Sequence, residues 1–273
     1  MPELPEVERA VRHLRAAIDG RIVERVEVLH PALRRRLRRG VLKTLAGTRI
    51  RAVERRGKHQ LVHLDDGRII HVHFRMNGDW VIGSTSDPRP RFARAVFSFA
   101  DGTRVVLDDS RALSTIDIHP ADAELSLGLG PEPSDPSLTA ASLRASLKRR
   151  RVPIKVALLD QSIIAGLGNI YTSESLWRAK IDPRAAAASI ELPVIRRLLS
   201  AIRAVIARAT GGRYSRLQGA RLDVYDREGK PCHRCRTAIE RVTQSGRSTY
   251  FCPHCQAGQR LASSNRAPRA RRS

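Results

Sequence analysis

The sequence predicts an α+β protein whose first half is rich in strands and whose second half is helical. Hydrophobic residues recur at helical spacing over residues 5–20, change to a period near two over residues 21–113, and return to helical spacing after residue 138. The length of 273 residues leaves room for two domains and a smaller module. A hydrophobic fraction of 41% is enough to build a core and argues against a wholly disordered chain.

The first half is expected to form one helix followed by an antiparallel sandwich or barrel. The helix over residues 5–20 begins at Pro5, ends at Gly20 and has one continuous hydrophobic face. Asp-Asp-Gly at 65–67 and Ala-Asp-Gly at 100–102 are turn signals that predict β-hairpins. The strand-like runs are 49–53, 60–64, 68–74, 79–82, 95–99 and 104–107.

The second half is expected to consist of helices separated by short turns. Residues 126–138 are dense in glycine and proline and form a linker. Thr139 is a suitable cap for the first helix, and Pro153 and Pro193 are suitable openings for two others. The tail from residue 259 is rich in arginine without acidic residues and is expected to be disordered. The expected helices are 139–149, 153–164, 170–180 and 193–211.

The strongly positive charge predicts a polyanionic partner. Lys and Arg number 50 against 27 Asp and Glu, which gives a formal net charge of +23. Nucleic acid is the commonest polyanion, and an arginine-rich surface from a biased genome is the alternative. Aromatic residues make up only 4%, which argues against a surface that binds mainly by stacking on bases. We see neither an apolar run of about 18 residues nor a basic, apolar leader, so we expect a cytoplasmic protein without a membrane span.

The cysteines predict one structural zinc ion. Two Cys-x₂-Cys pairs are separated by 16 residues, and four thiolates on two tight turns can enclose a tetrahedral Zn²⁺ without an open position for catalysis. Two disulfides are disfavoured in a chain without a secretion signal. His233 and His254 are alternative ligands inside the pairs, but four cysteines suffice, so we expect both to be surface residues. The expected ligands are Cys232, Cys235, Cys252 and Cys255.

The N-terminus has the chemical properties of a nucleophile. If Met1 is removed, Pro2 becomes a secondary amine, and an α-amino group has a pKa near 8, so a neutral fraction exists at neutral pH. Glu3 and Glu6 are close in sequence and could move protons at the reacting carbon. Taken alone, Pro2 is more simply explained as a residue that starts a helix.

Several motifs from residue 1 to residue 255 carry a resemblance to a known family. They are Met1–Glu8 (MPELPEVE), Arg56–Lys58 (RGK), His73–Gly78 (HFRMNG), Gly128–Pro133 (GLGPEP), Gly166–Leu176 (GLGNIYTSESL) and the two cysteine pairs. Together they are similar to formamidopyrimidine-DNA glycosylase of bacterial base-excision repair, whose superfamily also includes endonuclease VIII.

The resemblance implies an N-terminal helix plus antiparallel β-sandwich, followed by a helix–two-turn–helix domain with a C-terminal zinc ribbon. It also implies a bacterial cytoplasmic enzyme, associated with the nucleoid, that binds double-stranded DNA containing oxidised bases or abasic sites. We expect a monomer, since flipping one nucleotide needs one cleft. The expected domains are the catalytic β-sandwich at 1–125, the linker at 126–138, the helix–two-turn–helix domain at 139–227, the zinc ribbon at 228–258 and the basic tail at 259–273.

The resemblance also implies the catalytic roles of particular residues. Pro2 would attack C1′ of the sugar and form a Schiff base, after which β and δ eliminations would cut the strand. Glu3 would be the catalytic acid, and Glu6 would be a supporting carboxylate. Lys58 would contact a phosphate near the lesion, whereas without the motif it would be an ordinary surface lysine.

A further group of residues would bind the DNA. Met76 and Leu113 would fill the space left by the flipped nucleotide, and Arg111 would contact the orphaned base. Without the resemblance, Met76 would be a core residue and Asn169 a plain turn residue. The residues expected to bind DNA are Met76, Arg111, Leu113, Lys155, Asn169 and Arg247, the last from the zinc ribbon.

The chain departs from the family pattern in two places. Leu113 stands where the formamidopyrimidine type has Phe, beside Ala112 in place of Arg and Ser110 in place of Pro. The segment 213–223 is short where the typical enzyme has a loop that closes over oxidised guanine. We therefore expect weak activity on oxidised guanine and better activity on oxidised pyrimidines or abasic sites.

Two other functions compete with the glycosylase. The first is a non-catalytic DNA-binding paralogue that recognises damaged or distorted sites. The presence of Pro2, Glu3, Glu6 and Lys58 together argues against it, because binding alone does not need all four. The second is a zinc-ribbon protein that binds RNA or ribosomes, which an apparatus for wedging and flipping would fit poorly.

Overall fold

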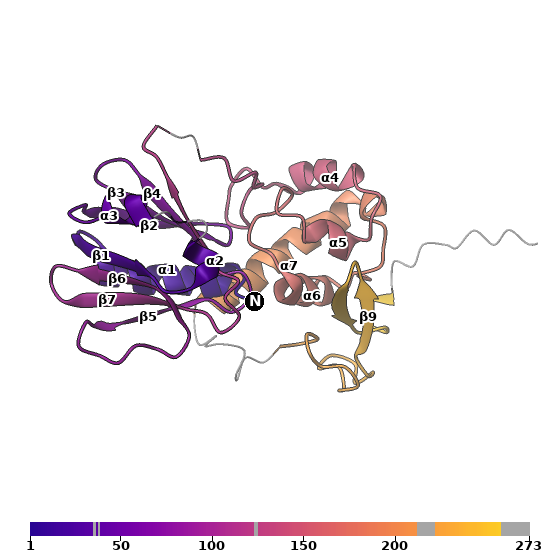
Figure 1. Ribbon diagram of the computed structural model, residues 1–273. Helices are drawn as coiled ribbons and strands as arrows, with labels where there is room; N and C mark the ends of the chain where they lie inside the picture. Colours follow the sequence, from indigo (N-terminus) through magenta and orange to yellow (C-terminus); the bar gives the residue numbers. More distant parts are fainter. Residues whose placement is uncertain (35–36, 38, 123–124, 212–221, 258–273) are drawn as a thin grey trace, which may run out of the picture. The chain divides into compact units, whose positions relative to one another are not determined.

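The protein divides into two compact units in the computed structural model, which describes residues 1–34, 37, 39–122, 125–211 and 222–257. The first unit contains the described residues of Met1–Leu129 and Arg208–Gly219, and the second those of Gly130–Ala207 and Ala220–Ser273. Figure 1 shows strands in the first unit, and helices with a short β-ribbon in the second.

The first unit is built from helix α1 (Leu4–Ile18) and two four-stranded antiparallel sheets. The strand order is β1-β6-β7-β5 in one sheet and β2-β3-β4-β8 in the other. Two short helices, α2 (Pro31–Arg34) and α3 (Arg39–Lys43), follow β1. The strands are β1 (Val23–Val28), β2 (Ile50–Arg56), β3 (His59–Leu64), β4 (Ile69–His73), β5 (Asp79–Ser84), β6 (Ala93–Phe99), β7 (Thr103–Asp108) and β8 (Thr115–His119).

One hydrophobic core joins the helix to both sheets. Helix α1 contacts β2 and β3 of one sheet and β5 of the other. Val11 and Leu14 of the helix pack in the same buried cluster as Val62 from β3 and Phe97 from β6. Because alternate residues of each sheet face this shared core, the unit is a β-sandwich. The sequence had left both a sandwich and a barrel open.

The predicted strands are confirmed, and two further strands were missed. The turns at 65–67 and 100–102 join β3 to β4 and β6 to β7 as predicted hairpins. The missed strands are β1 and β8, which form an edge of each sheet. Side chains on an edge strand are less buried than those on an inner strand. Strand β1 therefore carries charged residues at several positions, and its alternation of hydrophobic and polar residues is weak.

Helices dominate the second unit. Thr139 caps α4, where its hydroxyl accepts a hydrogen bond from the Ser142 N–H at 3.0 Å. The prediction of a helix from Pro153 to Ile164 is wrong beyond Leu158. Asp160 there accepts the Ser162 N–H at 2.9 Å, a local bond that competes with the helix. The elements are α4 (Ala140–Lys148), α5 (Ile154–Leu158), α6 (Asn169–Arg178), η1 (Ala187–Ser189), α7 (Leu192–Thr210), β9 (Glu240–Gln244) and β10 (Arg247–Phe251).

Two expectations concern segments outside this description. Residues 213–221 of the short segment lie outside the described residues, as does the basic tail at 259–273. Among the helices described, none is both long enough and apolar enough to span a bilayer.

Candidate functional site

The start of helix α1 holds two carboxylates directly after Pro2. Glu3 occupies the N-cap position, and the Glu6 carboxylate accepts a hydrogen bond from the Glu3 N–H at 2.9 Å. This capping box fixes the first turn of the helix. Glu3 is only 1% exposed, whereas Pro2 is half-buried. Pro2 therefore lies directly before a helical turn in which hydrogen bonds hold the Glu3 and Glu6 carboxylates in place.

Lys58 lies in the turn between β2 and β3 and is only 7% exposed. Arg55 joins this turn to helix α1, because it donates to the Glu8 carboxylate at 2.7 Å and to the Gly57 carbonyl at 3.0 Å. Burial acts to raise the pKa of Glu8, but Arg55 and Arg12 outweigh it and hold that pKa below the ordinary value. Glu8 thus stays ionised, and the ion pair keeps the lysine turn attached to the helix that begins at Pro2.

A buried carboxylate shapes the loop that carries Arg111 and Leu113. Asp109 is fully buried and accepts hydrogen bonds from the N–H groups of Arg111 at 2.9 Å, Leu113 at 2.8 Å and Ser114 at 2.8 Å. The Ser114 hydroxyl donates to the same carboxylate at 2.8 Å. Burial acts to raise the pKa of Asp109, but these hydrogen bonds outweigh it and the pKa lies below the ordinary value.

The same loop is bent so that its apolar tip faces outward. Ala112 has a φ of 52°, a left-handed conformation that costs an L-residue roughly 1 kcal/mol. Leu113 is 45% exposed, an unusual state for a large hydrophobic side chain. The network around Asp109 therefore holds a strained loop that presents Arg111 and Leu113 to solvent.

The loop that carries Met76 is tied to the Arg111 loop. The Ser114 Oγ atom lies 3.0 Å from the Phe74 carbonyl oxygen, and the Asn77 amide donates to the Ser110 hydroxyl at 3.1 Å. A Cβ atom at Gly78 would lie 2.4 Å from the Ser114 Oγ, so only glycine fits there. The structure therefore brings Met76, Arg111 and Leu113 together on two interlocked loops.

The second unit gathers Lys155 and Asn169 around one carbonyl group of the ribbon. Asn169 begins α6, and its side-chain amide donates to the Ser248 carbonyl at 2.8 Å. Lys155 of α5 donates to the same carbonyl at 3.5 Å and is fully buried. Directly before Ser248 in the sequence is the exposed Arg247, which begins β10. Lys155 thus supports the ribbon in this conformation, and its contact with DNA stays a prediction.

The hairpin β9–β10 presents Arg247 immediately after a tight turn. Ser245 and Gly246 both have positive φ, 48° and 71°, as a two-residue hairpin turn of type I′ requires. Gln244 pairs with Arg247 across this turn. The turn therefore sets the position of the arginine relative to the cysteine pairs.

The four cysteines fit a tetrahedral zinc ion. Their sulfur atoms all lie within 4.8 Å of one another, with 3.9 Å between Cys232 and Cys255 and 3.4 Å between Cys235 and Cys252. A Zn–S bond of about 2.3 Å places two sulfurs of a tetrahedron about 3.8 Å apart. His254 is exposed, and His233 Nδ1 lies 3.0 Å from Asp223 instead.

Sequence reasoning missed two buried carboxylates, Asp109 and Glu174. Glu174 in α6 accepts hydrogen bonds from the N–H groups of Asp223, Val224 and Tyr225, each at 2.9 Å. Burial raises the pKa of Glu174, while these hydrogen bonds oppose the shift. The sequence around Asp109 has turn residues that could have indicated a capped loop, but the partners of Glu174 are about 50 residues away and leave no local signal.

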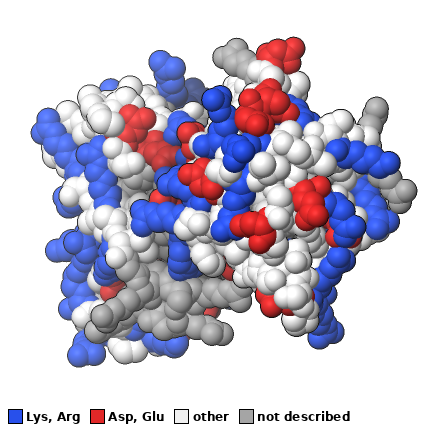
Figure 2. Space-filling view, turned by 90° about the vertical axis from the view of Figure 1, so that its left-hand side faces the viewer, with Lys and Arg blue, Asp and Glu red and all other residues white. Residues whose placement is uncertain are grey.

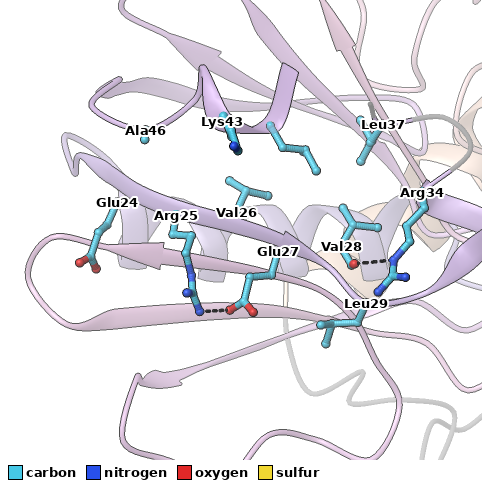
Figure 3. Close-up of a pocket in the computed structure, with 11 residues that line it drawn as sticks. Glu24, Arg25, Val26, Glu27, Val28, Leu29, Arg34, Leu37, Lys43 and Ala46 are labelled. Atoms are coloured by element: carbon cyan, nitrogen blue, oxygen red, sulfur yellow. Dashed lines mark hydrogen bonds and ion pairs between the residues drawn. The ribbon is translucent and has the colours of Figure 1, made fainter. Parts of the chain in front are cut away.

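A hollow in the first unit lies apart from the residues predicted to be catalytic. It measures about 600 Å³ and lies beside β1, α2 and α3 (Figure 3). Val26, Val28 and Leu37 line the hollow. The Glu27 carboxylate, which also lines it, forms an ion pair with Arg25 at 2.6 Å (Figure 3). Within the described chain, the residues predicted to be catalytic do not line this hollow.

Positive charge is spread over the face of the molecule seen in Figure 2. Figure 2 shows Lys and Arg side chains across the face that it presents, with Asp and Glu side chains between them. A broad distribution of this kind attracts a polyanion without selecting a sequence.

The predicted residues thus fall into two groups. Pro2, Glu3, Glu6, Lys58, Met76, Arg111 and Leu113 lie in the first unit, and Lys155, Asn169, Arg247 and the four cysteines lie in the second.

Three family models match successive parts of the chain. They are described as the formamidopyrimidine-DNA glycosylase N-terminal domain at residues 1–116, the formamidopyrimidine-DNA glycosylase H2TH domain at 129–218, and the zinc finger found in FPG and IleRS at 229–258.

Relatives named formamidopyrimidine-DNA glycosylase match over almost the whole chain. The protein of Paracoccus denitrificans is 40% identical over 280 residues, and that of Brucella ovis is 41% identical over 296 residues. Each match covers 94% of this chain and 100% of the relative.

Solved structures show the same fold. The Lactococcus lactis enzyme bound to DNA that contains an abasic site has a TM-score of 0.87 at 31% identity, covering 93% of this chain and 99% of that one. A MutM in complex with DNA that contains carbocyclic 8-oxo-G has a TM-score of 0.86 at 32% identity, with the same coverage.

Proposed function

The chain belongs to the formamidopyrimidine-DNA glycosylase family, and from this premise we propose that it is a bifunctional DNA glycosylase and abasic-site lyase of base-excision repair. Its substrate is double-stranded DNA with oxidised bases or abasic sites. It acts as a monomer in the bacterial cytoplasm, on the DNA of the nucleoid. The zinc ion held by the four cysteines is structural, since four sulfur ligands leave no position for substrate.

The burial of Glu3 and Lys58 carries the proposal. Acidic and basic side chains are rarely buried unless a structural or chemical role compensates the cost of removing them from water. Here a glutamate that is 1% exposed follows Pro2 directly, and a lysine that is 7% exposed lies in a turn fastened to the same helix. Buried ionisable groups of this kind are frequent in catalytic sites.

The proposed reaction begins at the nitrogen of Pro2 after removal of Met1. The nitrogen lone pair attacks C1′ and the glycosidic bond breaks. The base leaves with the bonding electrons and takes up the proton that the attacking N–H group gives up. Glu3 protonates the ring oxygen O4′ as the sugar opens, which leaves a cationic Schiff base. Loss of the C2′ proton then expels the 3′ phosphate, a second elimination expels the 5′ phosphate, and water releases the enzyme. Lys58 and the ordered Glu6 support the charges that develop in these steps.

The other predicted residues hold the DNA in the flipped state. Met76 and Leu113 fill the gap in the stack, and Arg111 offers paired donors to the orphaned base. Asn169 and Arg247 bind phosphates, with Lys155 close to the same ribbon. Leu113 can wedge but cannot stack, so we propose a weak preference for oxidised guanine and a stronger one for oxidised pyrimidines or abasic sites.

Borohydride trapping on duplexes with different lesions tests the proposal. Borohydride reduces a Schiff base to a stable amine, so the enzyme should become covalently attached to an abasic-site duplex. Blocking the Pro2 nitrogen, by acetylation or by retention of Met1, should abolish the adduct. Pro5→Ala is the matched control, since Pro5 lies in the same first turn but has no role in the chemistry.

The lesion series separates the alternatives. An adduct with abasic and oxidised pyrimidine duplexes, weaker with oxidised guanine, supports the proposed preference. A strong preference for oxidised guanine would contradict it. If no duplex gave an adduct, including the abasic one, the chain would be a DNA-binding paralogue without catalysis.

A further inference from the structure

Histidines gather on the outer face of the β2-β3-β4-β8 sheet. The chain has nine histidines, and five of them lie on these strands: His59, His63, His71, His73 and His119. His59 is opposite His73 in the strand pairing, and alternate residues of a strand share a face, so His71 lies on the same face. The opposite face carries the hydrophobic core. The cluster has no place in the glycosylase chemistry described above.

Two of these imidazole rings converge. The Nδ1 atom of His59 lies 2.7 Å from the Nε2 atom of His71, and the rings are stacked with centroids 4.9 Å apart. Both side chains are half-buried and reachable from solvent. The adjacent strands β3 and β4 hold them in place, so the approach of the two nitrogens is set by the sheet and not by a flexible loop.

We propose that His59 and His71 form a second metal site, which binds a divalent transition-metal ion through these two nitrogens, with water as the remaining ligands. Two nitrogens bound to one ion at about 2.0–2.1 Å are separated by about 2.9–3.4 Å, depending on the coordination angle. The observed separation needs only a small opening of the pair. Imidazole nitrogens suit zinc, copper and nickel ions, and not calcium or magnesium.

His59 is in the protonation state that metal binding requires. Burial, followed by the charges of His71, Arg75 and Lys58, lowers the pKa of His59 to about 4. The ring is therefore neutral at neutral pH. The hydrogen shared between the two rings would move to the outer nitrogen of its own ring, which leaves one lone pair on each converging atom.

The second site should be weaker than the cysteine site. Among the described residues, the four cysteines are the cluster in which three or more ligand atoms converge, so the histidine pair supplies two protein ligands. His73 is close, with its ring centroid 4.7 Å from that of His59, but its Nδ1 already accepts the Arg75 N–H at 2.9 Å. The cysteine site is thus filled first, and the two sites can be studied separately.

Nickel titration of the zinc-loaded full-length protein tests the proposal. Ni²⁺ is the probe because it favours imidazole, while four thiolates retain Zn²⁺. Calorimetry should show one saturable Ni²⁺ site in the wild type, with the zinc content unchanged by elemental analysis. His71→Phe should weaken Ni²⁺ binding by more than about tenfold, since losing a direct ligand costs at least as much as losing a supporting one. His63→Gln, on the same sheet but outside the pair, is the matched control and should bind as the wild type does.

NMR spectra of the wild-type protein test the same proposal without relying on the folding of the His71→Phe variant. Ni²⁺ is paramagnetic, so the imidazole signals of His59 and His71 should broaden before those of the other histidines. The proposal is overturned if no saturable nickel site exists, if a folded His71→Phe protein binds nickel as the wild type does, or if histidines outside the pair broaden first.

Discussion

Replacement of Asp109 by Asn should release the loop that carries Arg111 and Leu113. An asparagine has the same shape but only one acceptor oxygen. If the asparagine oxygen takes the place of the carboxylate oxygen that binds Leu113 and Ser114, it keeps those three hydrogen bonds. The asparagine NH₂ group then faces the Arg111 N–H, and since both groups are donors, no hydrogen bond forms between them.

The expected loss of stability can be worked from these bonds. Loss of the negative charge weakens each of three retained bonds by about 1 kcal/mol, and an unsatisfied Arg111 N–H adds about 1 kcal/mol or more. The sum of roughly 4 kcal/mol is a large share of the stability of a typical domain, yet less than the whole. If about 3 kcal/mol of it falls on loop formation, the affinity for lesion-containing duplex should fall about 100-fold.

Fluorescence anisotropy with an abasic-site duplex measures this affinity. Borohydride trapping on a single-stranded abasic oligonucleotide should remain unchanged, because a single strand has no orphaned base and no gap to fill. Ser110→Ala is the matched control in the same loop. It removes only the contact with Asn77 and should cost about 0.5–1.5 kcal/mol.

The stabilisation that Asp109 provides should also depend on pH. The pKa of Asp109 is lower in the folded protein than its ordinary value, so the stabilisation is present above about pH 4 and is lost as the pH falls through the folded pKa. The difference in unfolding free energy between wild type and Asp109→Asn should be constant from about pH 5 to 8 and shrink below about pH 4. Equal duplex affinity of the two proteins at neutral pH would refute the role given to this carboxylate.

Three further changes have definite expected results. Gly78→Ala places a Cβ 2.4 Å from the Ser114 Oγ, so it should destabilise both loops by about 1–3 kcal/mol in urea unfolding, and a neutral result would show that the loops adjust freely. Glu174→Gln keeps one acceptor oxygen for the Val224 and Tyr225 N–H groups and places its amide against the Asp223 N–H. It should lower the unfolding free energy by about 2–4 kcal/mol, whereas an unchanged thermal midpoint would contradict the anchoring role. Cys252→Ser or strong chelation should remove zinc and unfold the β9–β10 ribbon, with loss of DNA binding in a mobility-shift assay, and retained binding would show that the ribbon is dispensable.

Local features of the sequence were sufficient to predict much of this protein. The spacing of Cys232, Cys235, Cys252 and Cys255 predicts a zinc ribbon because ligands on two tight turns need few contacts with the rest of the chain. The period-two runs and turn signals likewise predict the inner strands and their hairpins. The roles of Pro2, Glu3 and Lys58 remain predictions that rest on the family and on their burial.

The tertiary structure alone decided which side chains act together. Asp109 shapes the Arg111 loop, Glu174 binds a segment about 50 residues away, and His59 meets His71 on the neighbouring strand. The edge strand β1 also becomes visible only through its pairing with β6. A periodic pattern reports which face of an element is buried, whereas the partner of a polar side chain depends on how distant segments pack, and that packing leaves no mark on the residues next to it in the chain.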